Sequence, residues 1–278
     1  MMPPKNLGPA TFFNPADNPG PELFPPELPV WEGLRLLKGY FERQSYTSLP
    51  ASFSTAAGPL PETLVVYYDE DSGNSELLAG SACEINYQPA TKGQLEVRHR
   101  GRLLAGAGVL MAGTVLMGRR IQLGRGVLVE SGAFLKEPLI IGDQSEIRQG
   151  AYLRGHCLIG RRCVVGHVTE VKHSIFMDDA KAGHFAYLGD SILGPGANLG
   201  AGTKLANLRF IGGNVQIRYE GGSVSSGLQK LGAILGAGCQ TGCNSVTNPG
   251  TLLGRGCFLL PNTTAPAGYH SANSIIRP

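Results

Sequence analysis

The 278-residue chain lacks the features of several large protein classes. Only 16% of its residues are charged, the net charge is +3, and no basic run is interleaved with aromatic residues, so nucleic acid is not an expected partner. No apolar run reaches the roughly eighteen residues of a membrane span, and Met1 to Asn18 lacks a basic region followed by an apolar run. None of the six cysteines forms a CxxC pair. We therefore expect a cytoplasmic protein with reduced thiols and no membrane contact.

Glycine, by contrast, is abundant, with 40 residues, and it follows a pattern with a period of six. One aliphatic-type position keeps this period from Val109 to Ala133 and, after one eight-residue step, from Ile141 to Met177. A second run extends from Leu235 to Ala265, and glycine often follows at once, as in Leu253-Gly254. A period of six is neither helical nor that of a simple strand, so the unit is a short strand plus a corner.

This repeat predicts an all-β chain whose residues 101–265 form a parallel β-helix of hexapeptide repeats. Three hexads make one triangular coil of about eighteen residues, and stacked coils bury the aliphatic column while strands pair from coil to coil. Glycine at the corners supplies backbone conformations that other residues reach poorly. A glycine-rich loop protein would have no reason to keep the phase.

The segments outside the repeat predict a small N-terminal region and a tail. Residues 1–30 are rich in proline and should be extended or partly disordered, and Val30 to Arg43 can form one short amphipathic helix. Leu64–Tyr68 and Glu84–Tyr87 resemble strands on either side of the turn Asp71–Asn74. Residues 1–100 would thus contain an arm, a helix and a small cap, and the cap has no glycine-rich phosphate loop. Residues 266–278 leave the repeat and are expected to form a tail.

The repeat is disturbed at two places, and both flank His184. From Met177 the column continues to Ala182, Leu188 and Leu193 only with two five-residue steps, so one coil is short. From residue 207 to 230 the period disappears, which predicts a loop of about twenty residues that projects from one corner. Long loops in compact domains are often functional.

Two cations are predicted at one corner of neighbouring coils. Arg154 follows the column residue Leu153, and Lys172 follows Val171 three hexads later, so the two should lie about 4.8 Å apart in backbone. Such cations repel each other unless an anion lies between them, which favours a phosphate clamp over two solvated surface charges. Glu170 could neutralise Lys172 or hold a hydroxyl or amine of a substrate.

His184 is the candidate acid–base residue. The same count places it one coil above His167 and one coil below Ala201, a small residue that leaves room for a ligand along the surface. Histidine exchanges a proton near neutral pH, although a lone histidine is more often a satisfied polar residue. The adjacent cations, together with Tyr187, Asn198 and Asn207, favour the catalytic interpretation. Coil stacking is therefore expected to bring His184, Arg154 and Lys172 to one common edge.

These residues also resemble a known family. The segment from His167 to Gly202, HVTEVKHSIFMDDAKAGHFAYLGDSILGPGANLGAG, resembles the acetyltransferase half of the bacterial bifunctional enzyme that acetylates glucosamine 1-phosphate and uridylylates the product. The matching elements are Arg154, Glu170-x-Lys172, Lys181-Ala182-Gly183-His184, Tyr187-Leu188-Gly189-Asp190 and Asn198-x-Gly200-Ala201-Gly202. The segment from Lys230 to Thr263 resembles the closing coils of stand-alone relatives.

The resemblance implies a left-handed β-helix, a homotrimer and acetyl-CoA as acyl donor, in the synthesis of UDP-N-acetylglucosamine and other cell-envelope precursors. It implies the following roles: general base His184; amine-orienting Asn207; phosphate binders Arg154 and Lys172; other substrate contacts Glu170, Tyr187 and Asn198; acetyl-CoA contacts Ala201 and Cys243. No metal is needed.

The chain departs from the family in ways that leave alternatives open. No nucleotidyltransferase half is recognisable, so uridylylation is not expected, and Leu208 stands where the family has a tyrosine. The acceptor could therefore be galactosamine 1-phosphate or a nucleotide-linked amino sugar. A non-catalytic β-helix, serving in assembly or in sugar-phosphate sensing, is the main alternative. A metal enzyme of the carbonic-anhydrase type is a weaker one, because His167, His173 and His184 include no close histidine pair in the sequence.

Overall fold

The computed structural model describes residues 7–14, 20–50, 53, 58–69 and 74–278. Residues 71–73 of the predicted turn and Pro3, Pro4, Pro15 and Pro19 of the predicted arm lie outside the described residues. No helix in the described part of the chain is both long and apolar enough to cross a membrane.

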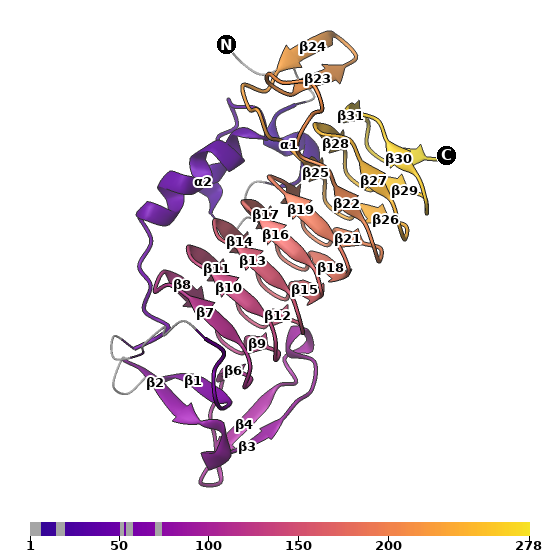
Figure 1. The fold of residues 1–278 in the computed structure, drawn as a ribbon. Coiled ribbons are helices and arrows are strands. Elements are labelled where there is room, and N and C mark those ends of the chain that lie inside the picture. The colour runs from indigo at the N-terminus through magenta and orange to yellow at the C-terminus, as the bar shows by residue number, and fades with distance from the viewer. Residues whose placement is uncertain (1–6, 15–19, 51–52, 54–57, 70–73) are drawn as a thin grey trace.

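Three sheets run along the molecule and form the sides of a triangular coil (Figure 1). In each sheet the coil strands pair in parallel with the strands of the coils above and below, as in the register Leu135↔Leu153↔Val171. Sheet 1 also has two antiparallel strands, β1 and β2, at its start. Sheet 1 contains β6 (Gly108–Leu110), β9 (Leu128–Val129), β12 (Glu146–Ile147), β15 (Val164–His167), β18 (Lys181–His184), β21 (Asn198–Leu199), β26 (Gln240–Thr241), β29 (Phe258–Leu259) and β32 (Ile275–Ile276). Sheet 2 contains β7 (Val115–Met117), β10 (Phe134–Lys136), β13 (Tyr152–Arg154), β16 (Glu170–Lys172), β19 (Tyr187–Gly189), β22 (Lys204–Leu205), β27 (Val246–Thr247) and β30 (Thr264–Ala265). Sheet 3 contains β8 (Ile121–Leu123), β11 (Leu139–Ile141), β14 (Cys157–Ile159), β17 (Ser174–Phe176), β20 (Ile192–Leu193), β25 (Ala233–Leu235), β28 (Thr251–Leu253) and β31 (Gly268–His270).

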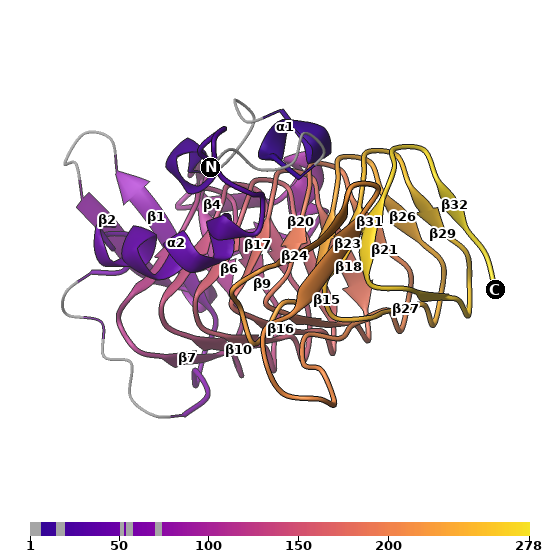
Figure 2. The same cartoon turned by 90° about the horizontal axis from the view of Figure 1, so that it is seen from above.

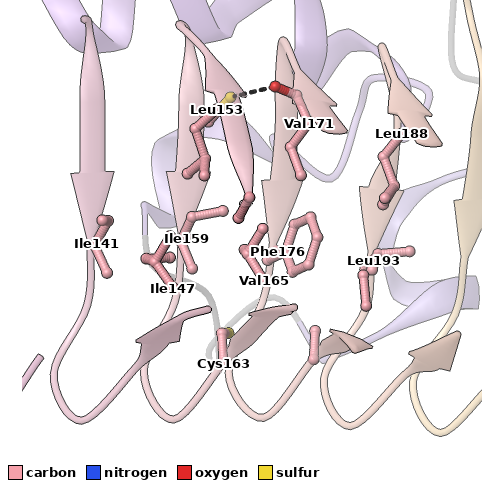
Figure 3. Close-up of a cluster of buried hydrophobic side chains, with 14 of the residues drawn as sticks. Ile141, Ile147, Leu153, Ile159, Cys163, Val165, Val171, Phe176, Leu188 and Leu193 are labelled. Atoms are coloured by element: carbon pink, nitrogen blue, oxygen red, sulfur yellow. Dashed lines mark hydrogen bonds between the residues drawn. The ribbon is translucent and has the colours of Figure 1, made fainter. Parts of the chain in front are cut away.

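The predicted fold class, an all-β parallel β-helix of hexapeptide repeats with a small N-terminal cap, is confirmed. The predicted aliphatic column fills the interior of the coil, where side chains such as Ile141, Leu153 and Val171 are almost completely buried (Figure 3). Three positions of the column are wrong. Val109 belongs to the cap cluster and Val115 is only partly buried, whereas the next residues, Leu110 and Leu116, lie in the core of the coil. Phe176 points into the core, whereas Met177 belongs to an apolar cluster on the outer side of sheet 3.

The irregular steps of the repeat all lie at the corner between sheets 2 and 3. The two five-residue steps run from Val171 to Phe176 and from Leu188 to Leu193, and each shortens the same corner. One coil later, residues 206–232 leave the helix there between β22 and β25. The predicted loop is present, but it carries an antiparallel hairpin of β23 (Gln216–Tyr219) and β24 (Gly222–Ser225). Its base is closed by the Leu231 N–H, which donates to the Asn207 carbonyl at 3.0 Å.

The N-terminal arm covers the outer face of sheet 3 and is not extended over its described residues. It forms α1 (Pro9–Phe12), the 3₁₀ turn η2 (Pro21–Leu23) and α2 (Glu32–Glu42), which lies alongside the coils and agrees with the predicted helix (Figures 1 and 2). These arm residues join one buried apolar cluster with the outward side chains of sheet 3: Leu7, Phe12, Phe13, Leu23, Phe24, Trp31, Leu34, Leu37, Phe41, Leu158, Ile175, Ile192, Ile234 and Leu252.

The cap closes the first coil. The predicted strands correspond to β1 (Leu64–Asp69) and β3 (Cys83–Asn86), but the sequence analysis missed β2 (Asn74–Ala79), which is the antiparallel partner of β1. β1 also pairs antiparallel with β6 and so extends sheet 1. Around β3, the turns η3 (Gly80–Ala82) and η4 (Ala90–Lys92) and the strands β4 (Glu96–His99) and β5 (Arg102–Leu103) complete a small sheet.

The expected C-terminal tail is wrong. Gly268–His270 and Ile275–Ile276 form β31 and β32, which pair with β28 and β29, so the coil continues almost to the last residue. The aliphatic signal fades here because Gly268 and His270 occupy positions that hold Thr251 and Leu253 in the coil before. Backbone pairing with the preceding coil keeps the segment in register.

Candidate functional site

Arg154 and Lys172 end neighbouring strands of sheet 2, as the spacing predicted. Each already has a carboxylate partner within the chain. Arg154 Nη1 donates to Glu170 Oε1 at 2.5 Å, and this hydrogen bond is the largest cause that raises the pKa of the guanidinium. Lys172 Nζ lies 3.6 Å from Asp190 Oδ2. The carboxylates of Glu170 and Asp190 therefore reduce the repulsion between the two cations without a bound anion. Glu170 pairs with Arg154 rather than with Lys172.

Asp190 is the buried centre of the polar cluster at the corner between sheets 2 and 3. His173 Nδ1 donates to Oδ1 at 2.8 Å, and Asn207 Nδ2 donates to Oδ2 at 2.5 Å. Burial by itself would raise the pKa of Asp190, but the hydrogen bonds from His173 and Asn207 outweigh it, so the pKa lies below its ordinary value. The sequence analysis named Asp190 only within a family motif and His173 only as a possible metal ligand, and it did not predict their pairing. Each stands where a five-residue step shortens the corner, and that step was a usable signal.

Asn207 and Tyr187 form a second link within this cluster. The Tyr187 hydroxyl donates to Asn207 Oδ1 at 3.3 Å, and burial is the main cause that raises the pKa of Tyr187. Asn207 is itself buried, so its amide connects strand β19, the Asp190 carboxylate and the base of the loop.

His184 lies at a different corner, where sheet 1 turns into sheet 2. Its register partner is His167, and the Gly202 N–H donates to the His184 carbonyl, so Ala201 follows on the next coil as predicted. Cys243 continues the same stack, because the Asn244 N–H donates to the Ala201 carbonyl. The His184 imidazole is exposed. Asn198 lies on sheet 1, between Lys181 and Gln240.

The candidate residues therefore form two groups at opposite ends of sheet 2. Arg154, Glu170, Lys172, Tyr187 and Asn207 belong to the face of sheet 2 or its corner with sheet 3, whereas His184, Ala201 and Cys243 line the corner with sheet 1 and Asn198 lies on that sheet. The expectation of one shared edge for Arg154, Lys172 and His184 is wrong. His184 ends β18, whereas Gly189, the residue level with Lys172, ends β19, so a corner and a whole strand of sheet 2 separate them.

Two histidine pairs are present. His167 and His184 are register partners, as the count predicted. The second pair, His156 and His173, has rings 6.0 Å apart and was not recognised from the sequence. Burial, followed by the charge of His173, lowers the pKa of His156. In the part of the chain that the structure describes, no group of three or more His, Cys, Asp or Glu side chains could hold a metal ion. All six cysteines are free thiols.

The fold and this arrangement define a parallel β-helix protein of hexapeptide repeats with polar groups on the two corners of one sheet. The family model of the GMPPB C-terminal domain matches residues 135–224. That range includes both histidine pairs, the polar cluster around Asp190 and the start of the loop.

Comparison with known proteins confirms the resemblance proposed from the sequence, over about a third of the chain. A protein of Sulfurisphaera tokodaii named bifunctional sugar-1-phosphate nucleotidylyltransferase/acetyltransferase is 40% identical over 97 residues, which are 35% of this chain and 24% of that protein. The bifunctional protein GlmU of Methanocaldococcus jannaschii is 40% identical over 95 residues, 34% of this chain and 23% of the relative. The match thus spans about a quarter of the length of these relatives. The solved acetyltransferase domain of PglB from Neisseria gonorrhoeae is 12% identical, with a TM-score of 0.22 over 57% of each chain.

Proposed function

We propose that the chain is an acetyl-CoA-dependent N-acetyltransferase that acts on an amino sugar with a phosphate on C1, with glucosamine 1-phosphate as the first acceptor to test. The observation that carries the proposal is the corner stack, in which an exposed imidazole lies directly beside the small side chain of Ala201. A Cβ at the neighbouring Gly183 would meet no atom within 4 Å, so the strip beside His184 is open. An extended thioester can lie along such a strip. The acetyltransferase activity in the name of the Sulfurisphaera tokodaii relative supports the same class.

In this mechanism His184 is the general base. An acceptor ammonium must lose a proton before its nitrogen can attack the thioester carbonyl, and the imidazole accepts that proton. The new C–N bond forms, the C–S bond breaks, and the thiolate of CoA leaves and takes up a proton. Ala201 and Cys243 would line the thioester and pantetheine, and Asn198 would contact the sugar. No covalent enzyme intermediate is required.

At the other end of sheet 2, Arg154 and Lys172 would bind the phosphate. Their ion pairs with Glu170 and Asp190 hold both cations in place but reduce the net charge of the clamp. Tyr187, between the two groups, would contact the sugar ring. Because its amide is already bonded to Tyr187 and Asp190, Asn207 acts as a positioning residue rather than as a direct contact to the amine.

We further propose a cytoplasmic homotrimer. In a single chain, the corner that holds His184 is separated from the phosphate clamp that holds Lys172. In a trimer, the His184 corner of one copy would face the Lys172 clamp of its neighbour and complete the site. Light scattering at assay concentrations should report a trimer; an active monomer would contradict this part of the proposal.

The decisive experiment measures CoA release by the full chain with glucosamine 1-phosphate, galactosamine 1-phosphate and their nucleotide-linked forms. His184→Ala should lose roughly 10² to 10⁴ in rate, the usual contribution of a positioned base, with an unchanged melting temperature. His167→Ala, one coil below, is the matched control and should stay within a few-fold of the parent. CoA release by His184→Ala at the parental rate would end the assignment.

A non-catalytic sugar-phosphate-sensing β-helix is the second candidate, and the internal ion pairs of Arg154 and Lys172 favour it. It predicts ligand binding by calorimetry without CoA release for any acceptor in the panel.

A further inference from the structure

An open groove of about 740 Å³ lies between the loop that follows Asn207, the β23–β24 hairpin and the upper part of sheet 2. This volume is in the range of sites that hold drug-sized ligands and exceeds what a monosaccharide phosphate needs. Its apolar lining comes mainly from the loop and from coils above the predicted clamp: Leu208, Phe210, Ile211, Val215, Val246 and Pro249.

The charge of the groove is positive and not neutralised. Arg209 and Arg218 line it, no lining residue is acidic, and neither guanidinium forms an ion pair with a carboxylate of the described residues. Each donates one hydrogen bond to a backbone carbonyl, Arg209 to Asn214 at 2.7 Å and Arg218 to Ala267 at 3.5 Å. The remaining N–H groups can bind an anion bidentately.

This situation is the opposite of that at the predicted phosphate clamp. There, Arg154 and Lys172 are balanced by Glu170 and Asp190, so the four groups carry no net charge. The groove therefore has guanidinium groups without a carboxylate partner, which the predicted clamp lacks. A multiply charged anion gains more from unpaired guanidinium groups than from cations that already hold carboxylates.

The groove is continuous with the candidate site. Tyr187 and Leu188 are register partners of Lys204 and Leu205, so Ala206, which lines the groove, lies one coil above Gly189. The next residue, Asn207, bonds Tyr187 and Asp190. A molecule bound at Tyr187 can thus extend along sheet 2 into the groove without leaving the surface.

The other side chains of the groove suit an aromatic heterocycle. Phe210 and Ile211 are strongly exposed, and the Phe210 ring is free to stack on a base. Gln216, Ser223 and Asn248 add hydrogen-bonding groups. We propose that the groove binds a nucleoside diphosphate and that, given the proposed function, this is the nucleotide part of a nucleotide-linked amino sugar. Arg209 and Arg218 would bind the two phosphates and Phe210 the base.

Calorimetric titration of the full chain with UDP alone tests the groove without acetyl-CoA. UDP should bind, and Arg209→Gln combined with Arg218→Gln should weaken it at least tenfold, about the loss expected when charge-assisted hydrogen bonds to phosphate disappear. Phe210→Ala should weaken UDP about tenfold but leave inorganic pyrophosphate unchanged, because only UDP has a base to stack. Arg102→Gln, which removes an exposed arginine from the cap, is the matched control and should bind like the parent. Thermal melts verify that the variants are folded.

The possible results separate the competing occupants. No binding of UDP at millimolar concentration, together with a stable oligomer that Phe210→Asp dissociates, would mean that a second copy fills the groove and would overturn the proposal. Binding of adenosine 3′,5′-bisphosphate but not of UDP would assign the groove to the nucleotide of CoA and overturn the acceptor assignment. UDP binding without CoA release from any acceptor would refute the N-acetyltransferase function and leave the groove standing. CoA release with glucosamine 1-phosphate and no UDP binding would support the N-acetyltransferase function and refute the nucleotide groove.

Discussion

Replacing Asp190 with asparagine should show how strongly the polar corner holds the coils together. The Asp190 side chain is 9% exposed and accepts hydrogen bonds from His173 and Asn207, while Lys172 lies nearby. Asparagine has the same shape and tolerates the positive φ of 49° at this position, so the change removes charge and one acceptor with little steric effect.

The expected loss is about 3 kcal/mol. A hydrogen bond to a charged group contributes about 1.5–3 kcal/mol, and the new Nδ2 would face the Asn207 Nδ2 donor, which leaves a buried donor unsatisfied at a cost of about 1–3 kcal/mol. At about 2–4 °C per kcal/mol for a chain of this size, the melting temperature should fall by about 10 °C.

Asp179→Asn is the matched control. Asp179 also has a positive φ, of 63°, and accepts two 2.8 Å bonds from Arg162, but its side chain is 49% exposed. An exposed pair of this kind contributes about 0.2–1 kcal/mol. Melting curves and urea titrations of both variants measure the difference. Equal losses would refute the reasoning, because burial would then not decide the strength of the Asp190 bonds.

Three further predictions follow from the geometry. Because the pKa of Asp190 is lowered in the folded state, its contribution to stability is complete above the ordinary aspartate value of about 3.8 and is lost as the pH falls through the lower folded value. In urea titrations from pH 7 to 2, the difference in unfolding free energy between the parent and Asp190→Asn should therefore shrink only in acid. Phe41→Ala should destabilise by about 3–5 kcal/mol in urea, since Phe41 is buried between the arm and sheet 3; a loss below 1 kcal/mol would mean that the arm adds little. Gly166→Ala should fail to yield folded protein in circular dichroism, because its Cβ would collide with the Gly183 carbonyl, whereas Gly183→Ala should melt like the parent and reduce only CoA release.

The surface of sheet 3 illustrates a signal that the sequence contained and the prediction did not use. Its strands are apolar at successive positions, as in Cys157-Leu158-Ile159 and Ala233-Ile234-Leu235, so both faces had to be buried. The six-residue repeat explains why the inner face of sheet 3 is apolar, but not why its outer face is apolar as well. The proline-rich start of the chain supplies the cover, although its prolines favour extended backbone locally.

The sequence by itself determined the coil, because a six-residue period acts locally: each hexad makes one strand and one corner, and stacking then follows from pairing with the previous hexads. It also determined which residues share a coil position, such as His167, His184 and Ala201. Only the tertiary structure decided which corner each irregularity occupies, which carboxylate takes which cation, and that His184 and Lys172 lie at opposite ends of one sheet. Those outcomes depend on where single residues are removed from a corner, and on side chains about seventeen positions apart that meet only after the coils have stacked.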